Sequence, residues 1–134
     1  MNGSTPRRIR RWTSFTVISN NVTNMASPLV LGEFELVVLL TMLQQGEPVY
    51  PLVLRDAIQE KTGRNTSRAM VFITLERLEQ KELVSSSYGD PTPVRGGRPK
   101  RFFKVERAGL AAVKRSVRTV ATLAAGLESV LGTR

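Results

Sequence analysis

The segment Asn65–Lys81, NTSRAMVFITLERLEQK, is the most informative stretch of this 134-residue sequence. Val71, Leu75 and Leu78 follow one another at spacings of four and three residues, which places them on one face of a helix. The three residues that open the segment, Asn-Thr-Ser, all belong to the types that cap helix N-termini. The segment therefore predicts a helix that starts after these polar residues and buries one apolar face.

Two further helices are predicted upstream. An apolar stripe predicts the first over Gly32–Gln45, and Gly46 ends it. The residues of that stripe are Leu36, Leu39, Leu40 and Leu43. The second is predicted over Pro51–Thr62, because proline suits the first turn of a helix. Only the short turn Gly63–Thr66 separates it from the third helix, which is the spacing of a helix-turn-helix motif.

Downstream of these helices the pattern changes to that of a β-hairpin. Leu83–Tyr88 and Lys100–Val105 are short segments rich in residues that favour strands. Between them, Gly89–Pro99 is dense in glycine and proline, and its prolines remove the donors that a further strand would need. The sequence therefore predicts two strands joined by a long tip, as in the wing of a winged helix.

The last part of the chain predicts one long helix, from about Arg107 to Leu131. Its apolar positions alternate at spacings of three and four residues, which is the pattern of a seam between paired helices. These candidate dimerisation residues are Leu110, Val113, Val117, Val120, Ala124, Leu127 and Leu131. The alternative is that this helix packs only on its own domain. Gly126 lies inside the pattern and costs about 1 kcal/mol relative to alanine in a helix.

The basic residues are concentrated in two regions. The formal net charge is +9. Residues 1–28 hold four arginines and no acid, and residues 95–118 hold nine bases against one acid, Glu106. Such an excess suggests nucleic acid, anionic lipid or an acidic protein as a partner.

The composition argues against several other classes of protein. The chain has no cysteine and no histidine, so it lacks the usual nucleophile, the usual general base and the commonest metal ligands. We therefore expect no enzyme, no cofactor and no metal site. The longest strongly apolar run is far shorter than the roughly 20 residues that a membrane-spanning helix needs. We expect a cytoplasmic, nucleoid-associated protein with no membrane partner.

The candidate DNA-binding residues lie on the third helix and on the hairpin. They are Ser67, Arg68, Ala69, Met70, Ile73 and Thr74 on the helix, and Arg95, Arg98, Lys100 and Arg101 at the hairpin tip. Ser67 and Arg68 suit phosphates or a guanine edge. Ala69, Met70 and Ile73 could touch thymine methyl groups or pack against another element. The hairpin cations could lie along phosphates or enter an adjacent minor groove.

Four segments and one dipeptide together resemble the PadR family of winged helix-turn-helix regulators. They are LGEFE at 31–35, RDAIQEKTGR at 55–64, TLERLEQKELV at 74–84, GGRPKRFF at 96–103 and Ala108-Gly109. The resemblance covers about residues 29–120. It implies a homodimeric, sequence-specific DNA-binding protein that is usually a repressor and dimerises through its C-terminal helix. Some relatives respond to phenolic or other apolar small molecules.

The sequence differs from the family pattern at three places. Tyr50-Pro51 stands where a Tyr-Gly pair is common, Phe72 stands where a tyrosine is common, and Glu82 stands where a glycine is common after the third helix. Phe72 has no hydroxyl to donate to a phosphate.

Taken together, the sequence predicts a mainly α chain with a small β-hairpin wing. We expect a disordered basic extension over residues 1–28, a winged helix-turn-helix DNA-binding domain over 29–106 and a C-terminal dimerisation helix over 107–134. The predicted function is a DNA-binding regulator, acting as a homodimeric repressor on a pseudo-palindromic operator. The alternatives are an adaptor that binds a protein through its winged helix, and an RNA-binding basic protein.

Overall fold

The computed structural model describes residues 30–89 and 99–132 of the chain. These residues form helices α2 (Glu33–Gln45), α3 (Pro51–Thr62) and α4 (Arg68–Gln80), strands β1 (Val84–Tyr88) and β2 (Arg101–Val105), and helices α5 (Arg107–Ala124) and α6 (Glu128–Leu131). The three predicted helices and the hairpin are present in the predicted order, which confirms a mainly helical winged helix. The expected N-terminal extension lies outside the described residues.

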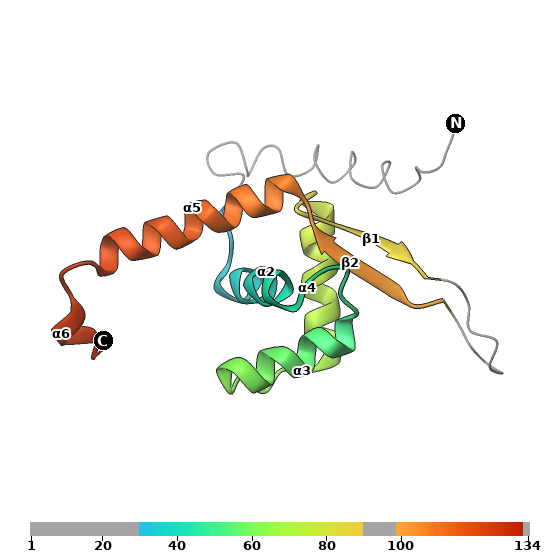
Figure 1. Ribbon diagram of the computed structural model, residues 1–134, viewed down its shortest axis with the longest axis horizontal. Helices are drawn as coiled ribbons and strands as arrows, with labels where there is room; N and C mark the ends of the chain where they lie inside the picture. Colours follow the sequence, from blue (N-terminus) through green and yellow to red (C-terminus); the bar gives the residue numbers. More distant parts are fainter. Residues whose placement is uncertain (1–29, 90–98, 133–134) are drawn as a thin grey trace.

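Helices α2, α3 and α4 pack around one apolar core. In Figure 1 the hairpin leaves this body on one side, and α5 leaves it on the other. The predicted apolar face of α4, Val71, Leu75 and Leu78, is fully buried. These side chains meet residues of α2, α3 and β2, namely Val38, Leu39, Met42, Leu54, Ile58 and Phe103. The core thus fixes α4 relative to both its helical neighbours and the hairpin.

Short-range signals explain where α3 and α4 begin and end. Pro51 occupies the first turn of α3, where a missing backbone donor costs nothing. Gly63 ends that helix in the left-handed region, at φ 75°. Ser67 caps α4, since its Oγ accepts a hydrogen bond of 3.0 Å from the backbone N–H of Met70. These boundaries follow from the residues at the helix ends.

The two strands form an antiparallel hairpin whose base is tied to the helical body. Val84 pairs with Val105, and Tyr88 pairs with Arg101. On its other side β2 meets Val49, whose backbone N–H donates to the Phe103 carbonyl at 2.8 Å and whose carbonyl accepts from the Phe103 N–H at 2.9 Å. This bridge joins the hairpin to the α2–α3 connection and positions the wing beside α3 and α4.

The prediction of one continuous C-terminal helix is wrong beyond Ala124. Ala125 adopts an extended backbone, and Gly126 lies in the left-handed region at φ 88°. The chain then starts the short helix α6, so Leu127 and Leu131 do not continue the apolar stripe of α5. The glycine inside the heptad pattern therefore marks a break. Across residues 30–89 and 99–132, no helix combines the length and the hydropathy needed to cross a bilayer.

The prediction that Val113 belongs to an intermolecular seam is also wrong. Val113 is only 5% exposed and belongs to the core of its own domain, together with Ala112. The first turns of α5 pack against α2 and β2, so they cover the body of the domain and not a second chain. Only the later part of α5 extends away from the body (Figure 1).

Glu82 links α4 to the hairpin in a conformation that disfavours its side chain. It is the one non-glycine residue with a positive φ, 64°, in the described part of the chain. Its N–H donates to the Glu79 carbonyl at 2.9 Å, which closes the turn after α4. The left-handed conformation costs a residue with a Cβ about 1–2 kcal/mol. A glycine, which the sequence comparison with the family pattern favours here, would adopt this conformation without that cost.

Replacing Glu82 by glycine is expected to raise the free energy of unfolding by about 0.5–1 kcal/mol, because relief of the left-handed strain outweighs the greater freedom of glycine in the unfolded chain. Urea denaturation measures the change. Glu60→Gly, at an exposed position of α3, is the matched control and should lower stability by about 1 kcal/mol. A loss of stability in Glu82→Gly would contradict this account of the turn.

Candidate nucleic-acid interface

The N-terminal half of α4 presents an exposed face opposite its buried one. Met70 and Ile73 are each 50% exposed, and Arg68 and Ala69 are exposed as well. The apolar members of this face could have packed against another element, but they are open to solvent. An exposed helix face that starts with a cation and continues with small and apolar side chains fits the major groove of DNA.

Thr74 does not belong to this face, contrary to the prediction. Thr74 is only 3% exposed, and its hydroxyl donates a hydrogen bond of 2.8 Å to the Met70 carbonyl. Thr74 lies beside Leu75 on the side of α4 that packs on the core. The helical spacing placed it at the edge of the exposed face, and the neighbouring elements bury that edge.

The described part of the wing places one predicted cation next to α3. Lys100 immediately precedes β2, and its carbonyl accepts a hydrogen bond of 2.7 Å from the Gly89 N–H. Its Nζ lies 5.1 Å from the centre of the Tyr50 ring, within the range of a cation–π interaction. Arg95 and Arg98, the other predicted wing contacts, lie outside the described residues.

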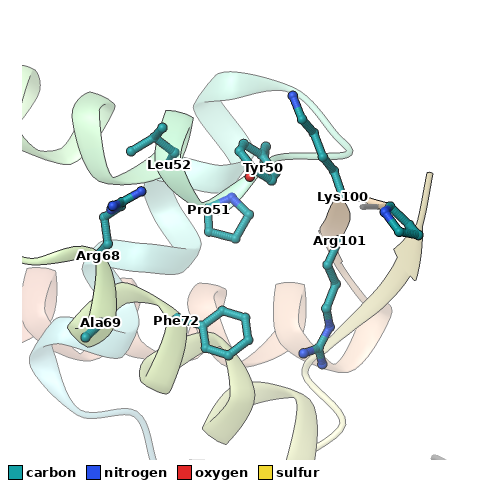
Figure 2. A pocket seen from close by; sticks show the side chains of 9 residues that line it. Tyr50, Pro51, Leu52, Arg68, Ala69, Phe72, Lys100 and Arg101 are labelled. Carbon is teal, nitrogen blue, oxygen red and sulfur yellow. The ribbon is translucent and has the colours of Figure 1, made fainter. Parts of the chain in front are cut away.

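An open groove of about 610 Å³ lies between α3, α4 and the start of β2. Its lining residues are Tyr50, Pro51, Leu52, Arg68, Ala69, Phe72, Pro99, Lys100 and Arg101. Figure 2 shows Arg68 and Lys100 on opposite sides of the groove, with Pro51 between them and Phe72 below. No ion pair within residues 30–89 and 99–132 involves Arg68 or Lys100. The groove thus combines two available cations with an apolar floor.

Sequence reasoning missed Tyr50, Pro51 and Phe72 as members of this surface. Tyr50 and Pro51 come from the start of α3, and Phe72 comes from α4, so only the packing of the two helices brings them together. The one available signal was that Pro51 and Phe72 stand at positions where the sequence differs from the family pattern. That signal does not show that the residues meet.

The predicted role of Arg101 in contacting DNA is not supported by its surroundings. Its guanidinium donates to Glu76 and to Glu79, each at 2.7 Å, and to the Ser86 hydroxyl at 3.1 Å. The side chain is only 18% exposed. Burial lowers the pKa of Arg101, but the hydrogen bond to Glu76 and the charges of Glu79 and Glu76 outweigh it and raise the pKa above its usual range. The positive charge of Arg101 is therefore neutralised by carboxylates of its own domain.

Several solved structures with a similar fold are named as transcriptional regulators. A PadR-like transcription factor from Bacteroides fragilis is 17% identical, with a TM-score of 0.62 over 82% of this chain and 98% of that one. A PadR family regulator from Eggerthella lenta is 19% identical, with a TM-score of 0.58 over 88% and 98%. This chain has the PadR-type winged-helix fold. No protein-family model and no curated protein matches its sequence.

The C-terminal part of this PadR-type fold leaves an apolar surface uncovered. On α5, Leu110, Val117 and Val120 are exposed, and Leu123 is 71% exposed. Leu127, Val130 and Leu131, at the start of α6 and within it, are exposed as well, and Ala124, the last residue of α5, is half-buried. Exposed apolar surface of this extent marks an interaction site in soluble proteins.

Proposed function

We propose that this protein is a sequence-specific regulator of transcription that binds double-stranded DNA as a homodimer and represses from a pseudo-palindromic operator at the nucleoid. The observation that carries the proposal is the exposed N-terminal face of α4 beside a groove with two available cations, Arg68 and Lys100. The PadR-type fold supports the proposal, because its solved examples carry the name of transcriptional regulators.

In the proposed complex, α4 enters the major groove with its N-terminal residues towards the bases. Met70 and Ile73 suit contact with thymine methyl groups, because both side chains are apolar and half exposed. Ser67 and Arg68 suit phosphates or a guanine edge. Lys100, across the groove from Arg68 (Figure 2), suits a phosphate on the same stretch of backbone.

The proposed dimer uses the apolar surface of α5 and α6. A dimer with two-fold symmetry would present two copies of α4, which would read two half-sites about 34–36 Å apart, or one turn of DNA. This arrangement explains why an operator would be pseudo-palindromic. It also assigns a role to apolar side chains that otherwise cost solubility.

Selection from a library of random duplexes tests the proposal. A regulator of this kind enriches one sequence with two related half-sites and binds it more tightly than a scrambled duplex at 0.15 M salt. Equal affinity for a structured RNA would favour the RNA-binding alternative. Failure to enrich or retain any duplex would refute DNA binding and would favour the adaptor alternative.

Arg68→Ala and Lys100→Ala are each expected to weaken binding to a mixed-sequence 30-base-pair duplex. Each should reduce the steepness of log K against log salt concentration by roughly 0.9, the effect of one lost phosphate contact. A fluorescence anisotropy titration at several salt concentrations measures both quantities. Lys61→Ala, at the opposite end of α3 from the groove, is the control and should leave the slope unchanged. Unchanged slopes in both test variants would remove the groove from the interface.

A further inference from the structure

Arg101 joins the start of the wing to two carboxylates of α4. One nitrogen of its guanidinium contacts Glu76 and another contacts Glu79, while its Nε donates to Ser86 on the facing strand. Ser86 in turn donates to the Glu79 carboxylate at 2.9 Å. Glu79 has a side chain only 11% exposed, so the network is closed to solvent on that side.

Aromatic rings hold the same guanidinium in place. Its central carbon lies 4.9 Å from the centre of the Phe103 ring and 5.4 Å from that of the Phe72 ring. The two rings meet edge to face, with centroids 6.4 Å apart. Because Arg101 is fixed by rings and by carboxylates, it has little freedom to turn towards a ligand. A planar guanidinium suits such a site better than an ammonium, because its donors point in fixed directions.

Glu76 lies next to the surface that is proposed to meet DNA, and Glu79 is joined to the same surface through Arg101. Glu76 lines a shallow hollow together with Phe72, Ile73 and Arg77. Arg101 itself is one of the residues that line the groove to which Arg68 and Lys100 also belong. Without Arg101, two unpaired carboxylates would remain beside a surface that must approach phosphates, and like charges repel.

We propose that Arg101 is a positioning residue for DNA binding, which masks Glu76 and Glu79 and fixes the wing against α4 without contacting DNA itself. This inference rests on the proposed function. According to this proposal, Arg101 increases the affinity for DNA by neutralising the Glu76 and Glu79 carboxylates. The competing interpretation is that Arg101 leaves the network and binds a phosphate directly.

Arg101→Lys separates the two interpretations. A lysine keeps the positive charge and binds phosphates well, but it cannot hold both carboxylates and Ser86 in one plane. If Arg101 is a positioning residue, Arg101→Lys lowers the affinity for the mixed-sequence 30-base-pair duplex by about fivefold. If Arg101 were a phosphate ligand, the affinity of Arg101→Lys would stay within twofold of the wild-type value, and the proposal would be overturned.

Removing the carboxylates provides the second test. Arg101→Met should lower the duplex affinity by about tenfold, and Arg101→Met with Glu76→Gln and Glu79→Gln should restore it to within about threefold. The slope of log K against log salt concentration should stay near the wild-type value in both variants, whereas Lys100→Ala should lose roughly 0.9 of it. If the triple variant still binds the duplex about tenfold more weakly than the wild-type protein, and its salt slope is lower by roughly 0.9, Arg101 contacts a phosphate and the proposal is overturned.

Circular dichroism at the assay temperature shows that the variants compared are folded. If Arg101→Met does not fold, the duplex affinities of Arg101→Lys and of the triple variant are compared with that of the wild-type protein instead. If the wild-type protein itself binds no duplex at low salt, the proposed function fails, and that outcome is distinct from a failure of the role of Arg101 in a protein that does bind.

Discussion

Gly109→Ala is expected to lower the free energy of unfolding by about 2–3 kcal/mol, in the upper part of the roughly 1–3 kcal/mol that overfilling a packed interior costs. A Cβ at position 109 would overlap the carbonyl oxygen of Leu83 and lie 2.9 Å from the Val105 Cγ1. That carbonyl already accepts a hydrogen bond of 2.9 Å from the Glu106 N–H, so it is not free to move. The close approach places α5 against both ends of the hairpin base.

Urea denaturation of Gly109→Ala measures the loss, and Ala108→Gly is the matched control. Ala108 is exposed on the same turn of α5, and its replacement should cost about 1 kcal/mol from helix propensity alone. Without a steric conflict, the reverse change at position 109 would stabilise the protein by a similar amount. A Gly109→Ala protein as stable as the wild type would show that α5 and the hairpin can separate at little cost.

Val117→Asp is expected to convert the proposed dimer into a monomer. Val117 is 44% exposed on the apolar face of α5, beyond the part that packs on the body. In a dimer its side chain would be buried, and an unpaired carboxylate there would be strongly unfavourable. We expect the dimer to weaken by at least about 100-fold, which corresponds to about 2.7 kcal/mol.

Sedimentation velocity at micromolar concentration measures the oligomeric state. Ala111→Asp is the control, because residue 111 is exposed and lies about 120° around the axis of α5 from Val117. Ala111→Asp should sediment as the wild-type protein does. A Val117→Asp protein that still sediments as a dimer would place the interface elsewhere, and a wild-type monomer would remove the homodimer from the proposed function.

Most of the fold could be predicted from the sequence because its signals are local. Pro51, Gly63 and Ser67 mark the ends of α3 and α4, and the structure confirms these boundaries. The hairpin follows from two short strands with a tip dense in glycine and proline. Each of these signals acts through the backbone of a few neighbouring residues, so no knowledge of distant contacts is needed.

The C-terminal helix shows where two local signals conflict. The heptad pattern predicted a helix to Leu131 in spite of the helix-propensity cost of Gly126 inside it. Once α5 leaves the body of the domain, its end has few contacts that would keep glycine helical, and Gly126 adopts φ 88°. The periodicity gave the wrong length for this helix, and it did not distinguish Val113, which is buried in its own domain, from the exposed Val117.

The candidate site was predicted in part. The exposed positions of α4 at Arg68, Met70 and Ile73 follow from helical geometry once the buried face is known. The groove does not follow, because its walls come from α3, α4 and β2 and meet only in the packed domain. Spacing along one element contains no information about which residues of another element face it.

The amino-acid sequence by itself determined the order of the elements, the buried faces of α3 and α4 and the excess of positive charge. It did not determine the buried face of α2, which is formed by Val38, Leu39 and Met42, whereas Leu40 and Leu43 of the predicted stripe are each 38% exposed. Only the tertiary structure decided which charges are available. Arg68 and Arg101 are the same residue type, yet Arg68 makes no ion pair with the described residues, whereas Arg101 is held by Glu76 and Glu79. Local preferences depend on a residue and its neighbours in the chain, but the availability of a charge depends on residues that packing brings within a few ångströms.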